Sequence, residues 1–276
     1  MKLPAKNIIN LRLLVQWSFL AWCVALGIQF SLFVRHFESS GQTAFYARPP
    51  GVEGFLPIGS LVSLKAWVTS GDFDPVHPAA LILFLTFIGM ALLTKKSFCS
   101  WLCPVGTLEE GLWKVGQKVF GRNFRIWNWL DIPLRFVKHI LLIFFIKAIL
   151  IDMPAQALKG FLNAPYWAIA DIKMLHFFTA PSTVSIIVIA LLAALSLVYK
   201  NFWCRYLCPY GALLGLFSFL SPLKVIRNPT ACTDCGHCSK VCPARIDVRK
   251  KAVVRSVECT ACLTCVGNCP EPQALA

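Results

Sequence analysis

The chain has 276 residues, of which 57% are hydrophobic and only 14% are charged. A soluble domain usually carries about 25% charged residues, so the composition excludes an ordinary soluble globular protein and favours an α-helical membrane protein; an aromatic content of 13% excludes intrinsic disorder. The net charge of +14 is explained by membrane topology, so no nucleic-acid partner is expected.

Four apolar segments are each close to the roughly 20 residues that cross a bilayer as a helix. They are predicted at about 13–34, 79–94, 134–151 and 182–199. The first lacks a small-residue cleavage site, so no cleavable signal peptide is expected. The composition becomes polar, basic and cysteine-rich after Pro222. This change predicts a membrane domain over 1–222 and a small second domain over 223–276.

Lysine and arginine are unevenly distributed among the segments that connect these spans. The two termini and the second connection hold twenty of them, whereas the first and third connections hold five. Basic loops stay in the cytoplasm. We therefore expect both termini and the second domain on the cytoplasmic side of a bacterial inner membrane, with membrane lipid as a partner.

Two internal repeats are visible in the membrane domain. Residues 99–108 match residues 204–213, 105 positions later, and each copy begins with a C-x3-C-P motif, at 99–104 and 204–209. The segment 57–65 resembles 165–173, with a proline followed eight positions later by lysine in both copies. The pattern predicts four transmembrane helices arranged as a 2+2 repeat, with a short interfacial helix in each half.

The second domain contains two C-x2-C-x2-C-x3-C-P motifs, at 232–243 and 259–270. In bacterial ferredoxins with this pattern, three cysteines of one motif and the last cysteine of the other hold each [4Fe-4S] cluster. The first cluster is then assigned to Cys232, Cys235, Cys238 and Cys269, and the second to Cys259, Cys262, Cys265 and Cys242. Structural zinc would not need this interleaving, and disulfides are disfavoured in the cytoplasm. A domain this small needs the clusters to stabilise its fold.

Four further cysteines form the two C-x3-C-P motifs: Cys99, Cys103, Cys204 and Cys208. Cysteines at i and i+4 share one face of a helix, and the repeat would bring the two pairs together at the inner ends of their spans. They would then ligate a third metal centre, either iron–sulfur or copper, or form two redox dithiols. The remaining interpretation is that these four cysteines are small buried core residues.

Four polar residues on the outer side are candidates for taking protons from a quinol: Glu53, His77, Asp171 and His176. Simple interface residues are the alternative. A transmembrane haem b needs two axial histidines, and only His139 lies within a predicted span, so intrinsic haem b is not expected.

The order of the motifs, two C-x3-C-P behind membrane spans and then two C-x2-C-x2-C-x3-C-P, resembles membrane-bound polyferredoxins of the NapH type and the C-terminal half of NosR. The resemblance covers about residues 75–276 and twelve cysteines. It implies four spans, two cytoplasmic [4Fe-4S] clusters and electron transfer from quinol to other redox proteins of a respiratory complex. The protein would then be an electron-transfer component of a quinol dehydrogenase. The alternatives are assembly of a copper or haem–copper oxidase centre and redox sensing by a membrane ferredoxin.

Overall fold

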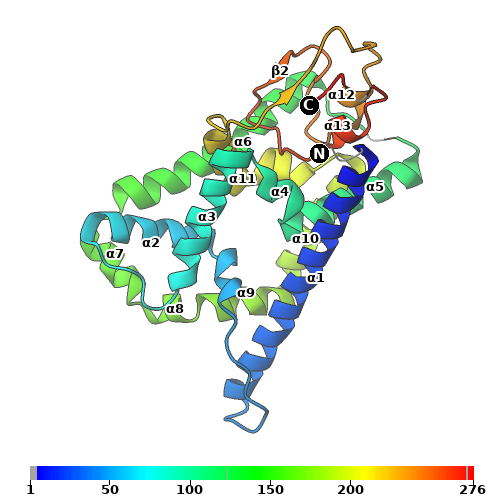
Figure 1. Cartoon of the computed structure of the whole chain (residues 1–276). Helices are drawn as coiled ribbons and strands as arrows, with labels where there is room; N and C mark the ends of the chain where they lie inside the picture. Colours follow the sequence, from blue (N-terminus) through cyan, green and yellow to red (C-terminus); the bar gives the residue numbers. More distant parts are fainter. Residues whose placement is uncertain (1–4, 123, 272) are drawn as a thin grey trace. The chain divides into compact units, whose positions relative to one another are not determined.

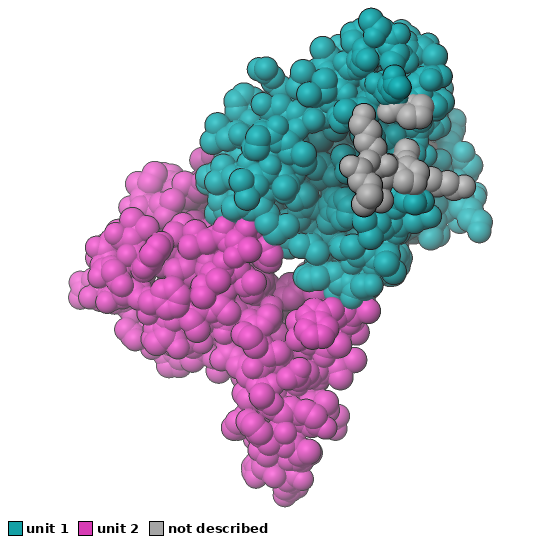
Figure 2. All heavy atoms as spheres, viewed as in Figure 1, with its two compact units in different colours: residues 1–20, 88–139, 192–276 teal, residues 21–87, 140–191 magenta. Residues whose placement is uncertain are grey.

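The computed structural model describes residues 5–122, 124–271 and 273–276, so the first four residues of the predicted membrane domain lie outside it. The described chain is mostly helical, with one small sheet of two strands (Figure 1). It divides into two compact units, coloured separately in Figure 2. Unit 1 comprises residues 1–20, 88–139 and 192–276, and unit 2 comprises residues 21–87 and 140–191.

The elements follow one another with short connections. In chain order the first half contains α1 (Ala5–Glu38), the 3-10 helix η1 (Pro50–Phe55), α2 (Pro57–Ser70), α3 (Pro78–Thr94), α4 (Ser97–Trp101), α5 (Pro104–Phe120) and α6 (Asn128–Ile146). The second half contains the π-helix η2 (Lys147–Asp152), α7 (Ala155–Leu162), α8 (Pro165–Ala168), α9 (Ala170–Thr179), α10 (Thr183–Val198), the π-helix η3 (Trp203–Leu207), α11 (Pro209–Ser218), β1 (Val225–Ile226), α12 (His237–Val241), β2 (Val253–Val254) and α13 (Thr264–Gly267).

Proline and glycine set the ends of several helices. Helix α2 begins at Pro57 and α5 begins at Pro104, where proline is tolerated because the first N–H groups have no partner within the helix. Both helices end before a glycine in the left-handed conformation, Gly71 at φ 72° and Gly121 at φ 68°. Glycine adopts this conformation without a steric penalty.

Unit 2 has its own apolar core, formed where α2 packs against α7 and η2. The buried residues are Leu56, Val62, Ala66, Ile149, Leu158, Leu162 and Trp167. Lys65 extends from α2 and donates hydrogen bonds through Nζ to the carbonyl groups of Ile149, at 3.0 Å, and Met153. These carbonyls lie where η2 ends and lack helical partners. The lysine of the first interfacial repeat therefore satisfies a helix end rather than facing solvent.

Only part of the predicted set of spans meets the length and composition of a membrane helix. Among the described residues, Asn7–Glu38 is long and apolar enough, and a second candidate arises if α9 and α10, bent by 72°, form one span. Helix α3 has 17 residues, which is about 25 Å of a hydrocarbon core of about 30 Å. Helix α6 carries Asp131, Arg135 and Lys138 in its first turns. The four-span repeat therefore stays a prediction.

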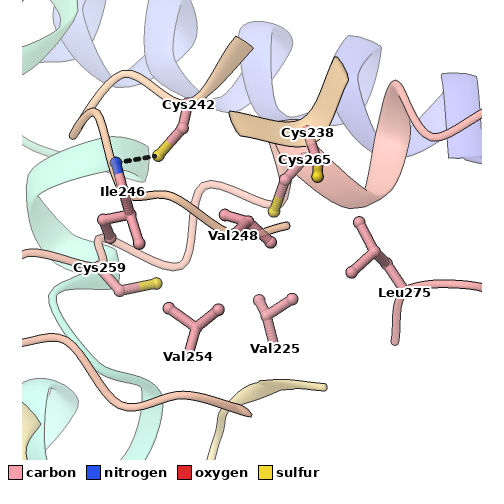
Figure 3. Packing of buried hydrophobic residues seen from close by; sticks show 9 residues of the cluster. All are labelled: Val225, Cys238, Cys242, Ile246, Val248, Val254, Cys259, Cys265 and Leu275. Atoms are coloured by element: carbon pink, nitrogen blue, oxygen red, sulfur yellow. Dashed lines mark hydrogen bonds between the residues drawn. The ribbon is translucent and has the colours of Figure 1, made fainter. Parts of the chain in front are cut away.

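The C-terminal part of unit 1 is built around the antiparallel strands β1 and β2, paired as Val225 with Val254 and Ile226 with Val253. The last residue closes this region, because the N–H of Ile226 donates to the carbonyl of Ala276 at 2.8 Å. The short helices α12 and α13 lie at the same end of unit 1 (Figure 1). Between strands and helices the core consists of a few apolar residues interleaved with cysteines (Figure 3).

Candidate metal centres and a buried polar cluster

Four cysteines line one space in the C-terminal region, which we call cavity A. They are Cys242, Cys259, Cys262 and Cys265. The space amounts to about 380 Å³, and its other walls are mainly apolar, with Val225, Val248 and Val254 among them. Figure 3 shows three of these thiols within the apolar core, with the N–H of Ile246 donating to Sγ of Cys242 at 3.4 Å.

A second space of about 340 Å³, cavity B, is lined by the other four ferredoxin cysteines. They are Cys232, Cys235, Cys238 and Cys269. Nη1 of Arg227 donates to Sγ of Cys232, 3.6 Å away. Of the other cysteines, Cys235 is exposed and Cys238 is buried. Each cavity thus takes three cysteines from one motif and one from the other, which is the grouping that the spacing predicts.

The two ferredoxin loops share an unusual backbone. In each loop the residues just before and just after the second cysteine are left-handed: Asp234 and Gly236 around Cys235, and Ala261 and Leu263 around Cys262. Left-handed residues reverse the chain over a few positions, and for a residue such as leucine this costs about 1–2 kcal/mol. With the third cysteine of each motif in the following short helix, Cys238 in α12 and Cys265 in α13, the common geometry gathers three thiols around one space.

The donor sets fit one [4Fe-4S] cluster in each cavity. Burial, together with the neighbouring thiols of the set, raises the pKa of Cys265, and burial raises the pKa of Cys242 to about 11. Four thiolates crowded without a cation are therefore unfavourable here. Among the described residues no three His, Cys, Asp or Glu side chains converge as ligands of a single metal ion.

The two C-x3-C-P motifs have matching local structures. Cys103 and Cys208 each precede a helix that starts with proline, α5 at Pro104 and α11 at Pro209. The Sγ of Cys208 accepts a hydrogen bond from a backbone N–H of the first turn, 3.2 Å away. Two positions after Pro104, glycine is needed for close packing, whereas the site of a Cβ on Gly211 has no atom nearer than 3.5 Å. A Cβ on Gly106 would lie 2.3 Å from the carbonyl oxygen of Cys99.

The structure brings the four C-x3-C-P thiols close enough to affect one another's protonation. Burial raises the pKa of Cys99 to about 12 and that of Cys103 to about 11, and other thiols of the set add to both effects. Burial also raises the pKa of Cys204. Reactive cysteines usually have a lowered pKa, so these thiols, left without a metal, are held in the protonated form.

Glu109, which the sequence analysis did not single out, organises the second C-x3-C-P motif. Its Oε1 accepts hydrogen bonds from the N–H of Trp203 at 2.6 Å and from Oγ of Ser196 at 3.0 Å. Its Oε2 accepts from the N–H of Cys204 at 3.1 Å. A buried carboxylate therefore holds the start of η3 in place. The second repeat has Leu214 at the position that matches Glu109. The comparison of the two repeats therefore gave no signal for the role of Glu109.

The segment that carries the first C-x3-C-P motif also contacts the lining of cavity A. Ser100 donates to the carbonyl of Thr260 at 2.6 Å, and Trp101 donates through Nε1 to the carbonyl of Ala261 at 3.1 Å. Both acceptors lie in the loop that carries Cys259 and Cys262. The segment between Cys99 and Cys103 is therefore hydrogen-bonded directly to the loop that lines cavity A.

Basic residues lie near the loop that carries Cys259. The carboxylate of Glu258 is paired with Nζ of Lys96 at 3.3 Å and with Nζ of Lys138 at 2.6 Å. These two lysines hold the pKa of Glu258, against the effect of burial, at about 2. Lys95 is only 1% exposed, and its Nζ has no hydrogen-bond partner among the described residues.

A buried polar cluster lies in unit 2 and contains three of the four predicted quinol residues. Arg48 joins them: its Nη2 lies 2.8 Å from the carboxylate of Asp171, 2.8 Å from Nδ1 of His77 and 3.5 Å from the carboxylate of Glu53. Glu53 also accepts from the N–H of Ala80 at 3.0 Å, at the start of α3. Glu53, His77 and Asp171 are 4%, 0% and 4% exposed.

His77 is positioned from both sides. Its Nε2 lies 2.9 Å from the carbonyl of Trp167, so Nε2 carries the proton and Nδ1 accepts from Arg48 in the neutral form. Burial lowers the pKa of His77, but the Glu53 carboxylate and the Trp167 carbonyl outweigh burial and raise it. Asp74 completes the cluster by accepting from Nε1 of Trp167 at 2.9 Å.

The fourth predicted quinol residue, His176, is not part of this cluster. It is half exposed and lies 3.6 Å from the carboxylate of Glu38. Arg48, Asp74 and Trp167 were missed by the sequence analysis. The signal for Arg48 was its charge within an otherwise weakly basic connection. Asp74 and Trp167 carried no pattern that distinguishes them from other loop and interface residues.

Comparison with known proteins gives the family. The description "4Fe-4S binding domain" matches residues 76–123 and 181–227, and "4Fe-4S dicluster domain" matches residues 224–270. The chain is 48% identical over 270 residues to the "Putative electron transport protein YccM" of Escherichia coli K12, covering 98% of this chain and 75% of that protein. The chain belongs to the NapH-type family of ferredoxin-type electron-transport proteins.

More distant relatives agree with this assignment. The "Ferredoxin-type protein NapH" of Escherichia coli K12 is 27% identical, covering 66% of this chain and 61% of that protein. "Protein NirI" of Paracoccus denitrificans is 26% identical, covering 80% of this chain and 33% of that protein. No solved structure matches the chain. The matched regions contain all twelve motif cysteines, and the protein is an iron–sulfur electron-transport protein.

Proposed function

We propose that the protein is a membrane-bound subunit that passes electrons between the quinol pool and a redox protein of a respiratory complex. The observation that carries the proposal is the direct contact between two kinds of cysteine site. Ser100 and Trp101, which lie between Cys99 and Cys103, donate to the loop that lines cavity A. Centres held at neighbouring sites are suited to carrying electrons through the protein.

In this proposal the cysteines of cavity A hold one [4Fe-4S] cluster and those of cavity B hold another. Bound clusters would supply one-electron transfer, and the protein sets their position and potential. The support is the grouping of thiols, three from one motif and one from the other around each cavity. Membership of the family with 4Fe-4S domains adds to it.

The four C-x3-C-P cysteines are proposed to form a third redox site. Their burial and mutual proximity favour a metal centre over two dithiols that exchange with solution, because a buried thiol with a raised pKa is a poor nucleophile. The match of both motifs to a "4Fe-4S binding domain" favours iron–sulfur over copper.

The membrane arrangement is proposed to be four spans in a 2+2 repeat, over domain 1–222, with domain 223–276 and both termini in the cytoplasm. The apolar helix Asn7–Glu38 supports the first span. The repeated C-x3-C-P structures support the repeat. Reporter fusions test it: a reporter that is active only outside the cytoplasm is expected to work after Asp72 and to fail after Ala276. The opposite pattern would invert the topology.

The polar cluster of unit 2 is proposed to take protons from quinol. Oxidation of a quinol releases two electrons and two protons. The Nδ1 of His77 is a proton acceptor with a raised pKa, and Glu53 and Asp171 are carboxylates within reach of the same guanidinium. Arg48, whose side chain is 28% exposed, is the part of the cluster that a ligand reaches first.

Iron and acid-labile sulfide analysis of the purified protein is the first test. About eight irons per chain are expected for two clusters, and about ten to twelve for a third iron–sulfur centre. Replacing Cys99 and Cys204 with serine should lower the iron content to about eight without changing the signals of the other clusters. Zinc without iron would refute the proposal.

Stopped-flow reduction by a menaquinol analogue in detergent tests the quinol role. His77→Gln should slow cluster reduction by about 100-fold, in the range that general-base catalysis supplies. His176→Gln is the matched control and should leave the rate unchanged, since His176 lies outside the cluster. If the wild type is not reduced at all, the quinol role is wrong while the iron–sulfur assignment stands.

A role in assembling a copper or haem–copper oxidase centre is the second candidate. The observation that favours it is the proximity of four thiols, since thiolates are soft ligands that suit an ion such as Cu(I). Stoichiometric Cu(I) binding that depends on Cys99 and Cys204, in a protein already loaded with iron, would support this candidate over a third iron–sulfur centre. Redox sensing by the same cysteines is a further alternative, and it requires a partner whose affinity changes with cluster oxidation.

A further inference from the structure

A large open hollow of about 650 Å³ lies in unit 1 and adjoins cavity B. It is formed by residues from the start of α6 and the segment before it, from η3, and from the ferredoxin region around α12. Cationic side chains dominate its lining: Arg125, Arg135, Arg205, Lys240, Arg245 and Arg249. We call it the arginine hollow. It shares Cys235, Gly236 and Arg249 with cavity B.

The lining of the arginine hollow contains fewer carboxylates than cations, and these carboxylates already have partners. Only Asp131 and Asp247 belong to its lining. Asp131 accepts from Nε and Nη2 of Arg205, both at 3.1 Å, and also from Arg135 and Tyr206. Asp247 accepts from Oγ of Ser239 at 3.0 Å and pairs with Lys250 at 3.7 Å.

Three cations of the hollow therefore have no carboxylate partner among the described residues. Arg125 and Lys240 make no ion pair there, and Arg245 donates only to the carbonyl of Phe124, at 2.8 Å. Arg249 has only a long contact of 3.9 Å with Asp234. Arg205, by contrast, is held in place by Asp131.

The free cations also repel one another. Burial first, and then the nearby guanidinium groups of Arg205, Arg125 and Arg135, lower the pKa of Arg245. Clustering like charges is unfavourable unless an anion joins them. A concave site lined by one sign of charge also focuses the field that attracts such an anion.

We propose that the arginine hollow binds a multiply charged oxyanion of the phosphate class, held by Arg125, Lys240 and Arg245 beside Cys235. Guanidinium groups present planar pairs of donors that match phosphate oxygens. The size of the hollow accommodates a phosphate that is part of a larger molecule, either a soluble organic phosphate or the headgroup of an anionic lipid. Both sources share the chemistry that these side chains recognise.

One consequence rests on the proposed function. If cavity B holds a cluster, an anion beside Cys235 disfavours the extra negative charge of the reduced state. Binding and reduction are linked reciprocally. The anion is therefore expected to bind more tightly to the oxidised protein than to the reduced protein.

Calorimetric titration of inorganic pyrophosphate into the iron-loaded protein, in a neutral detergent at constant ionic strength, tests the soluble source. The double substitution Arg125→Gln with Arg245→Gln should weaken binding at least about tenfold, because it removes two charged hydrogen-bond donors. Arg255→Gln is the matched control, since Arg255 is exposed and lies outside the lining. It should leave the affinity unchanged.

Nanodiscs of phosphatidylcholine with or without phosphatidylglycerol test the lipid source. Preferential recovery of phosphatidylglycerol with the wild type, lost in the double variant, assigns the site to a headgroup; pyrophosphate binding without it assigns a soluble phosphate. Full iron content establishes that the variants are folded, and Arg125→Lys with Arg245→Lys should restore part of the binding. Absence of both kinds of binding, or binding equal in wild type and double variant, would overturn the proposal. Equal pyrophosphate affinities of the oxidised and the dithionite-reduced protein would instead overturn the redox linkage alone.

Discussion

At the scale of single residues, the notable feature is a buried cation beside a proposed cluster. Lys95 is 1% exposed, adopts a left-handed conformation at φ 59°, and has no hydrogen-bond partner for Nζ within the described chain. Burial lowers the pKa of Lys95, and the thiol of Cys259 acts in the opposite direction. An isolated ammonium group is costly in a protein interior, so its charge is best explained by nearby thiolates that remain negative.

We expect Lys95→Met to lower the reduction potential of the centre in cavity A. Methionine keeps much of the side-chain length but removes the positive charge. The interaction of that charge with one negative charge on the centre contributes about 1–2 kcal/mol at an effective dielectric constant of about 20. The shift is then on the order of tens of millivolts for a one-electron couple. Redox titration followed by electron paramagnetic resonance measures it. Lys251→Met, at an exposed position, is the control; an equal shift in both variants would contradict the assignment.

The histidine of the polar cluster gives a prediction about pH. Because the folded-state pKa of His77 is raised, its contribution to stability is fully present below the unfolded pKa of about 6.5 and is lost as pH rises through the folded value. Thermal unfolding in detergent should therefore show stability falling as pH rises above about 6.5. His77→Gln should flatten this dependence, whereas His176→Gln should keep it. An unchanged profile in His77→Gln would show that other groups cause the dependence.

At the scale of elements, close helix contacts depend on single glycines. In α5 a Cβ on Gly116 would lie 1.8 Å from the carbonyl oxygen of Leu197, in α10. Small residues allow two backbones to approach in this way. In the same helix, Gly111 has no atom within 4 Å of the site of its Cβ. The two glycines thus differ in environment while sharing one helix.

This difference predicts opposite effects of the same substitution. Gly116→Ala should destabilise the protein by about 1–3 kcal/mol, because α5 and α10 must move apart. Gly111→Ala should be neutral or stabilising by up to about 1 kcal/mol, since alanine favours a helix. Thermal unfolding of both variants under one set of conditions makes the comparison. Equal effects of the two substitutions would show that α5 and α10 do not meet as described.

At the scale of the whole molecule, the C-terminal region lacks a core large enough to hold it together. Its buried set contains Val225, Ile246, Val248, Val254 and Leu275, and the rest is cysteine. Small domains of this kind need a metal or another cross-link. Unit 2 has an apolar core of its own, formed by α2, α7 and η2.

Removing iron should therefore unfold residues 224–276 selectively. After anaerobic treatment with a chelator and an oxidant, limited proteolysis should cut within this region while α2, α3 and α7 stay protected. Mass spectrometry of the fragments locates the cuts. Reconstitution with iron and sulfide should restore protection, which excludes irreversible damage as the cause. A region that remains protected without iron would show that its apolar core is sufficient.

The sequence by itself determined the features that depend on local spacing. The two sets of four cysteines could be predicted because each ferredoxin motif places three thiols within seven positions and the fourth four residues later. The starts of α2, α5 and α11 were marked by prolines for a similarly local reason. Family membership also followed from these motifs.

Only the tertiary structure decided which distant polar groups meet. Glu53, His77 and Asp171 lie together because Arg48 pairs with them, whereas His176 pairs with Glu38 instead. Glu109 holds η3, and the cations of the arginine hollow come from segments more than a hundred residues apart. A periodic pattern in the sequence does not reveal which distant residues pair, or which buried charge has no partner. Both depend on how the elements pack against one another.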